Sequence, residues 1–505
     1  MKLGRQLPNR LANPVPAPRP VPATPLALIN VPKAAPLGTQ LALVGIMATG
    51  IFLQGDTPTQ IGRFAAIGVG LSLMISLALD LRRGVQNVIR ADVMAILAFY
   101  FLTLFELLFP QTEFDVMTNA RATHMAVIIV LVGMAGLLVG RHIPRPKKQP
   151  FAETLTREVP AAWIIMIFFT ALFIGFAYML ASVDFNVLVM LDWFMAPRFS
   201  QPWGRGKFGD WRALLFELNM LTFLIPPLGG VILARRDRYA ITALVGVSAG
   251  LALTFFYSFS SGTRNLFASH LVTFLIGYAF SLPANRRKEI VPLCIGGAVL
   301  FMAASTAMLK FRTGGLKNWI ATGEGSAAPM EKTVFVDYNL CAISRLVDVF
   351  PSHHAFLGWE VPFQAFIRPI PRAIWKGKPE GLSMSIEQAL GAENMTIAAS
   401  FAGESYIAGG MIGVIIGGLF FGIATGWWSY LSSSRNSELG VLIYASGFFA
   451  AVISMRSLFS FTTALLPTIT AIVIGSYAVK TLIAQTRRLL NRRPALQRPP
   501  SPPNR

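Results

Sequence analysis

The stretch "FIRPIPRAIWKGKP", residues 366–379, gathers four cations between three prolines, namely Arg368, Arg372, Lys376 and Lys378. Each proline fixes its own φ angle and disfavours helix for the residue before it, so we expect extended backbone at the start. If the chain then turns helical, Arg372 and Lys376 lie on one face. An arginine fork suits a phosphate and a lysine supplies a point charge, so one interpretation is a phosphate-bearing ligand. The other interpretation is a basic helix at a membrane surface, anchored by Trp375.

Two further charged residues mark the start of predicted helices. Arg264 ends the run "SSGTR", whose serines and glycine allow a ligand to approach the backbone closely. The same side chain could instead extend to the membrane interface. Glu404, in "GESY", begins a very apolar helix, where the helix dipole favours a carboxylate. It could also act as a base or orient an arginine, and Tyr406 follows it on the same helix.

Histidines and cations also occur in two long segments between predicted helices. His353 and His354 are adjacent, so on a helix their rings diverge and suit a shared metal ion poorly, whereas one of them could be a general base. Arg312 and Arg345 lie in the same segment. Arg205 lies among tryptophans, a combination that suits a sugar phosphate but is also typical of an interfacial aromatic belt. We expect no metal site and no cofactor.

The composition indicates the elements that must position these residues. Of 505 residues, 54% are hydrophobic and 13% are charged, whereas soluble domains carry about 25% charged residues. We therefore predict an all-α, polytopic membrane protein with about twelve transmembrane helices of roughly 20 residues each. They run roughly over residues 37–53, 61–79, 92–109, 124–140, 161–181, 213–233, 241–260, 265–281, 291–309, 405–430, 439–455 and 462–483.

Charge sorting between these helices sets the predicted topology. The net charge of +20 comes mostly from loops that follow even-numbered helices and from both tails. Short cytoplasmic loops attract lysine and arginine, so both termini are predicted to be cytoplasmic, and nucleic acid is not an expected partner. The two cysteines, Cys294 and Cys341, show no disulfide framework and no metal-ligand spacing.

The chain divides accordingly into five parts. A proline-rich tail, 1–36, and a basic proline-rich tail, 486–505, are predicted to be disordered. Residues 37–309 hold helices one to nine, with an extracytoplasmic loop at 182–212. Residues 310–404 form a long extracytoplasmic loop between helices nine and ten, and residues 405–485 hold the last three helices. Long loops are exempt from the charge rule, so the cations at 310–404 need another explanation.

The segment "GWEVPFQAFIRPIPRAIWKGKP", followed by "GESYIAGGMIG", resembles the oligosaccharide repeat-unit polymerases of the Wzy type, which make O-antigen and exopolysaccharide. That family has a long extracytoplasmic loop ending in a Pro-Arg, Trp, Lys-Pro pattern and then Gly-Glu-x-Tyr at the start of the next helix. Its upstream Ser-x-Gly-x-Arg is similar to residues 260–264. The resemblance covers about residues 255–425, and the chain departs from it at "AGG", where the family often has a more polar run.

The resemblance implies a GT-C-like membrane glycosyltransferase of the bacterial inner membrane that needs no metal. One undecaprenyl-pyrophosphate-linked oligosaccharide donates its chain to a sugar hydroxyl of another, and a chain-length regulator protein is the implied partner. Preorganised cations would stabilise the pyrophosphate as it leaves. We assign this to Arg264, Arg368, Arg372 and Lys378, with Lys376 as a weaker member. Further substrate contacts are expected from Arg312, Arg345, Tyr406, Trp375 and Arg205.

A proton acceptor is needed for the attacking hydroxyl. Glu404 is the first choice, and His353 or His354 is the second. Two alternatives stay open. An O-antigen ligase shares the fold and the donor, and a polyprenyl-glycan flippase or other transporter shares the membrane topology, although carriers usually bind near the bilayer midplane.

Overall fold

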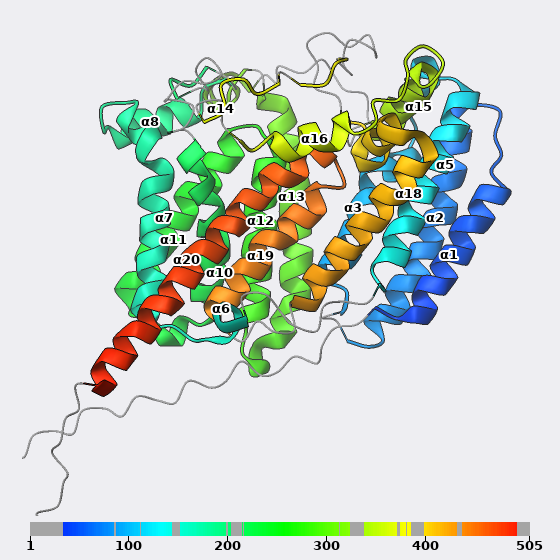
Figure 1. Ribbon diagram of the computed structural model, residues 1–505. Helices are drawn as coiled ribbons and strands as arrows, with labels where there is room; N and C mark the ends of the chain where they lie inside the picture. The colour runs from blue at the N-terminus through cyan, green and yellow to red at the C-terminus, as the bar shows by residue number, and fades with distance from the viewer. Residues whose placement is uncertain are drawn as a thin grey trace, which may run out of the picture.

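The computed structural model describes residues 34–84, 87–111, 113–143, 152–197, 200–203, 215, 217–312, 314–323, 338–370, 374–379, 381–384, 398–431 and 437–491. Within these ranges the chain is helical and has no strand. The helices lie side by side, and most of them run between two ends of the molecule (Figure 1). We call the end with α14 (Leu316–Thr322), α15 (Asn339–Val349) and α16 (Glu360–Ile367) the loop end. The tail end is the opposite one, with α6 (Ala152–Thr156) and the last turns of α20 (Leu458–Asn491).

Among the described residues, seven helices are long and apolar enough to cross a membrane, which confirms a polytopic helical membrane protein. They are α2 (Pro58–Leu81), α5 (Ala120–Gly140), α7 (Ala161–Ala181), α11 (Ile241–Ser260), α13 (Ile290–Phe311), α18 (Ser400–Leu431) and α20. The other five expected spans also coincide with helices, but these are shorter or less apolar: α1 (Pro36–Ile51), α3 (Ala91–Thr103) with η2 (Phe105–Leu108), η3 (Leu218–Leu224) with α10 (Ile225–Ala234), α12 (Arg264–Ser281) and α19 (Glu438–Ile453). The twelve-span topology and the GT-C likeness therefore stay predictions. The remaining described helices are α4 (Phe114–Met117), α8 (Val187–Phe194), η4 (Arg236–Arg238) and η5 (Ala284–Glu289).

Local sequence explains where several of these helices begin. The Thr57 hydroxyl accepts a hydrogen bond from the Gln60 amide, with a proline at the first position of α2. The Asn119 side chain accepts from the Ala122 amide at the start of α5, and the Ser437 hydroxyl accepts from the Gly440 amide at the start of α19. Such caps satisfy backbone donors that have no partner inside the helix.

Basic residues gather at the tail end. Arg235 and Arg238 both pair with the buried carboxylate of Glu438, where α19 begins. Arg286, on η5, donates to the Ala234 carbonyl oxygen at the end of α10. These contacts bring cations from two separate loops together, those after α10 and after α12.

Glycines let α18 pack closely on α5. A side chain at Gly136 would lie 2.8 Å from the Gly418 backbone, and one at Gly140 would lie 2.6 Å from the Leu419 carbonyl oxygen and 2.9 Å from Gly422. The two backbones therefore approach each other as in small-residue membrane helix pairs.

The first part of α18 is a separate arm, which the sequence did not predict. The backbone leaves helical geometry at Gly409 and at Gly410, where φ is +60°. The rings of Phe401 and Phe421 lie 5.2 Å apart, although 20 residues of continuous helix would separate them by about 30 Å. Residues 400–408 therefore fold back on the later part of α18. We call them the re-entrant arm, and 411–431 keeps the length of a span.

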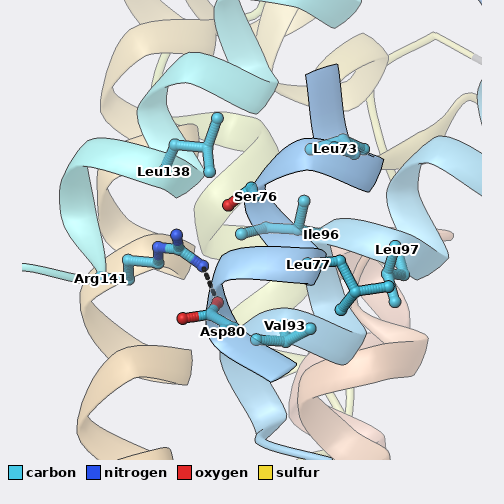
Figure 2. Close-up of a pocket in the computed structure, with 9 residues that line it drawn as sticks. All are labelled: Leu73, Ser76, Leu77, Asp80, Val93, Ile96, Leu97, Leu138 and Arg141. Carbon is cyan, nitrogen blue, oxygen red and sulfur yellow. Dashed lines mark ion pairs between the residues drawn. The ribbon is translucent and has the colours of Figure 1, made fainter. Parts of the chain in front are cut away.

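A buried ion cluster lies near the tail-end termini of α2, α3 and α5. The Arg90 Nε atom donates to the Asp92 carboxylate over 2.9 Å, and Arg141 lies 3.8 Å from Asp92 and 4.0 Å from Asp80. All four side chains are 2% exposed. Figure 2 shows Arg141 facing Asp80 across a small cavity of about 20 Å³. Two positive and two negative charges cancel, so the cluster fixes the helix ends without a net buried charge.

Candidate functional site

Arg264 and Arg312 are brought together at the loop end. The turn between α11 and α12 has Gly262 in the left-handed region, with φ +63°. A side chain at this position would lie 3.2 Å from the Arg312 Cα atom, so the turn rests directly on the end of α13. The Thr263 amide donates to the Ser261 hydroxyl and holds the turn. Arg264, which is half-buried, begins α12, while Arg312 is exposed and follows α13.

An apolar cavity of about 570 Å³ lies between α11, α12 and α13, on the tail-end side of this turn. On α12 its lining residues follow Arg264 at spacings of three, seven and ten residues, which places them on the helix face that begins with Arg264. That face runs for about 15 Å. The lining residues are Phe255, Phe256, Phe259, Phe267, Leu271, Phe274, Leu300, Ala303, Ala304 and Ala307. The cavity therefore suits a hydrocarbon chain whose polar head lies near the two arginines.

A second group of predicted residues surrounds the start of α20. The Glu404 carboxylate, on the re-entrant arm, accepts hydrogen bonds from the Ser457 hydroxyl over 2.7 Å and from the Leu458 amide. The Arg368 guanidinium lies over the Phe459 ring, 5.8 Å from its centroid, and its charge acts on Glu404. Glu404 is only 4% exposed, so its carboxylate caps α20 and faces a cation.

Lys378 holds the backbone of this stretch. Its ammonium group donates to the carbonyl oxygens of Arg368 and Ile370, over 3.0 and 2.9 Å. These carbonyl oxygens follow the end of α16, so Lys378 supplies donors that the helix end lacks. Lys376 and Trp375 are exposed beside it.

Arg372 and Arg205 lie outside the described residues. Of the four cations in residues 366–379, the structure therefore places Arg368 and Lys378 near each other. Lys376 lies on the surface next to them.

The two histidines lie in a turn after α15. The His353 Nδ1 atom is 3.0 Å from the Asp348 carbonyl oxygen, and the His354 Nδ1 atom is 2.7 Å from the Ala355 carbonyl oxygen. A carbonyl oxygen only accepts, so each Nδ1 donates, and Nε2 of the neutral ring is left as a proton acceptor. His353 is exposed and His354 is half-buried.

Tyr406 and the backbone next to it tie the re-entrant arm to this histidine turn. The Tyr406 hydroxyl donates to the Phe350 carbonyl oxygen over 3.2 Å, and the Phe350 ring lies 5.4 Å from the His354 ring. The Leu357 amide donates to the Ile407 carbonyl oxygen and the Gly358 amide to the Ala408 carbonyl oxygen, both over 2.8 Å. The carbonyl oxygens freed by the break at Gly409 and Gly410 are thus satisfied.

Arg345 packs away from these groups, against the segment before α5. Its Nε atom donates to the Met117 carbonyl oxygen over 3.0 Å. Nearby, Tyr338 donates to the Gln111 side chain over 3.0 Å. Burial, reinforced by the carboxylates of Glu106 and Glu113, raises the pKa of Tyr338, so the phenol keeps its proton. The hydrogen bond from Arg345 to the Met117 carbonyl oxygen therefore docks α15 onto the segment before α5.

Sequence reasoning missed the cavity and the buried ion cluster. The phenylalanines of α11 and α12 carried a signal, because Phe255, Phe259, Phe267 and Phe274 recur at helical spacing beside the "SSGTR" turn. Asp80, Arg90 and Arg141 are charges at the ends of predicted spans. In a sequence, a charge in a loop and a buried charge at the end of a span look alike.

The chain was compared with protein-family models, with curated proteins and with solved structures, and none of them matches.

Proposed function

We propose that the protein is a membrane polymerase of the Wzy type, which joins polyprenyl-pyrophosphate-linked oligosaccharide repeat units into a surface polysaccharide. The loop end would face away from the cytoplasm, because the basic loop residues gather at the tail end. The observation that carries the proposal is the apolar cavity beneath Arg264 and Arg312. It offers a hydrocarbon chain a place in the membrane, and it offers two cations to the phosphates at the membrane surface.

The reaction breaks the bond between the anomeric carbon of the donor sugar and the pyrophosphate oxygen. A hydroxyl oxygen of the acceptor sugar forms the new bond to that carbon, and its proton passes to a base. Polyprenyl pyrophosphate leaves with the bonding electron pair. Negative charge therefore grows on the pyrophosphate, and cations that are already in place stabilise it without reorganisation. This part of the mechanism falls to Arg264 and Arg312, with Arg372 as the further cation predicted from the sequence.

We propose a histidine rather than Glu404 as the proton acceptor. Both carboxylate oxygens of Glu404 accept hydrogen bonds at the start of α20, and the side chain is almost completely buried. His353 and His354 each keep Nε2 as an acceptor in the neutral ring. In this proposal Glu404 orients Arg368, and one of the two histidines receives the proton. The reaction needs no metal and no cofactor.

The test uses the full-length protein in nanodiscs with undecaprenyl-pyrophosphate-linked repeat units. Wild-type protein should produce a ladder of glycan lengths and release undecaprenyl pyrophosphate. Arg264→Ala and Arg312→Ala should each lose activity by about 100-fold or more, the usual effect of removing one group that stabilises developing charge. Lys288→Ala, an exposed cation of η5, is the matched control and should keep the ladder.

Normal ladders from both arginine variants would contradict the proposal. The same assay separates the two rival functions. A ligase would form no ladder without a lipid-core acceptor, and a flippase would move the intact lipid-linked repeat across the bilayer without releasing undecaprenyl pyrophosphate.

A further inference from the structure

Helix α16 lies across the loop end and packs only one of its faces on the bundle. It contacts α18 and α20, and Figure 1 shows it next to the start of α20. Val361, Ala365 and Ile367 are buried on this face. The Thr462 hydroxyl of α20 donates to the Ala365 carbonyl oxygen and fixes the helix in place. The position of α16 is therefore set by the two membrane helices beneath it.

The opposite face of α16 carries large apolar side chains that are exposed in the part of the chain that the structure describes. Trp359 is 77% exposed and Phe366 is 73% exposed, and Phe363 lies between them at helical spacing. Beyond the helix, Ile374 is 72% exposed and Trp375 is also exposed. We call these five residues the aromatic stripe. So many large exposed apolar side chains on and just after one short helix mark a surface that binds something apolar.

The two helices that α16 contacts also carry surface that is expected to face lipid. On α18, Ile412 and Ile416 are 71% and 62% exposed, four residues apart. On α20, Val473 and Tyr477 are 61% and 74% exposed, also four residues apart. Both helices are apolar enough to cross a membrane, so these side chains require hydrocarbon around them. A helix packed across the loop end of both lies where hydrocarbon gives way to headgroups.

Exposed cations flank the stripe. Arg368 directly follows α16 and rests on the Phe459 ring of α20, and Lys376 follows Trp375. Tryptophan and phenylalanine beside arginine and lysine is the composition of helices that lie in a membrane interface. The cations match the phosphates of lipid headgroups, and the aromatic rings match the upper acyl region.

We propose that α16 is an interfacial helix, which inserts the aromatic stripe into the lipid leaflet at the loop end. The inference holds whether or not the protein is a glycosyltransferase, because it depends only on the exposed side chains and the two membrane helices. The inserted helix fixes the depth of Arg368, so this guanidinium lies at the level of lipid phosphates. A covering protein or a second copy of the chain is the competing occupant.

Tryptophan fluorescence tests the proposal with the native full-length chain. The protein is placed in nanodiscs of phosphatidylcholine, with and without bromine on the upper carbons of the acyl chains. The chain has nine tryptophans, so the contribution of one is obtained by comparison with its phenylalanine variant. Trp359→Phe reports on the stripe. Trp203→Phe is the matched control, because Trp203 is 4% exposed and packs against the Phe194 ring.

We expect brominated lipid to quench the Trp359 contribution. Trp359→Phe should therefore lower the amplitude of the lipid-quenchable signal, and Trp203→Phe should leave that amplitude unchanged. Quenching of the Trp359 contribution by aqueous acrylamide, but not by brominated lipid, would place the stripe in water and overturn the proposal. Protection from both quenchers would show a protein partner or a second copy over the stripe, and would overturn it as well.

Discussion

Phe401 lies against Phe421, with ring centroids 5.2 Å apart, because the chain reverses at Gly409 and Gly410 between them. The reversal buries the re-entrant arm against the rest of α18 and against α5. It also presents Glu404 to the start of α20 and Tyr406 to the histidine turn. Two of the predicted site residues are therefore positioned by one break in a helix.

The contact between the arm and α18 depends on glycines, which gives the first prediction. A Cβ atom at Gly413 would lie 2.2 Å from the Ser405 carbonyl oxygen. Gly413→Ala should lower stability by about 1–3 kcal/mol, the usual cost of overpacking a close contact. Gly296→Ala on α13 is the control, since a Cβ atom there meets nothing within 4 Å. It should be neutral or slightly stabilising, because alanine favours helix over glycine. Thermal unfolding in detergent measures both, and equal melting temperatures would contradict the predicted contact.

The second prediction separates a capping role for Glu404 from a role as base. Glu404→Ala removes the acceptor for the Ser457 hydroxyl and the Leu458 amide, and should destabilise the protein by about 1–3 kcal/mol. Glu404→Gln keeps an amide oxygen as acceptor, so it should be more stable than the alanine variant and keep partial polymerase activity.

Replacement of the true base should cost about 10²–10⁴ in rate without loss of fold. We expect this from His353→Gln or His354→Gln, since both rings are outside the packed core. A Glu404→Gln protein as stable as wild type but fully inactive, with both histidine variants active, would reverse the assignment. Thermal unfolding and glycan ladders from the same preparations give the comparison.

The helices could be predicted from the sequence because apolar runs of about 20 residues have few alternatives. The twelve expected segments all coincide with helices, and the cations of two of their loops, those after α10 and α12, lie together at the tail end. The 3₁₀ turn at η3 was not predicted, although Pro226 and Pro227 lie in the first turn of α10, just after it. The re-entrant arm was missed because hydropathy does not report a reversal of the chain.

The site was predictable only as a set of residue types. The sequence identifies Arg264 and Arg312 as cations in different segments, but their proximity depends on the Gly262 turn resting on α13. Glu404 was predicted at the start of a helix, and the helix it caps is a different one, α20. Arg345 was expected to contact substrate. The structure adds that its Nε atom donates to the Met117 carbonyl oxygen, a contact that only tertiary structure supplies.

The third prediction concerns the apolar cavity. Ala307 of α13 lines it, so Ala307→Phe should fill part of the space beneath Arg312. If the cavity holds the polyprenyl chain, this variant should raise KM for the long-chain donor and have a smaller effect on a donor with a short prenyl chain. Val299→Phe is the control, because Val299 lies on the same helix and is 64% exposed. Polymerisation kinetics with both donors measure the effect, and unchanged KM values for Ala307→Phe would place the chain elsewhere.

The fourth prediction concerns the buried ion cluster. Arg141→Gln leaves Asp80 and Asp92 with one buried cation, Arg90, so the cluster becomes negative inside the protein. The loss should cost about 3–5 kcal/mol, as for other buried pairs that lose one partner. Adding Asp80→Asn to Arg141→Gln removes the excess negative charge and should recover part of the stability, so the two changes should be non-additive.

Lys317→Gln is the matched surface control. Its pair with Asp192 is more than half exposed and should be worth less than about 1 kcal/mol. Unfolding of the wild type, Arg141→Gln, Asp80→Asn, the double variant and Lys317→Gln in the same detergent tests the coupling. Additive effects of the two cluster changes would show that Arg141 and Asp80 do not interact across the small cavity between them.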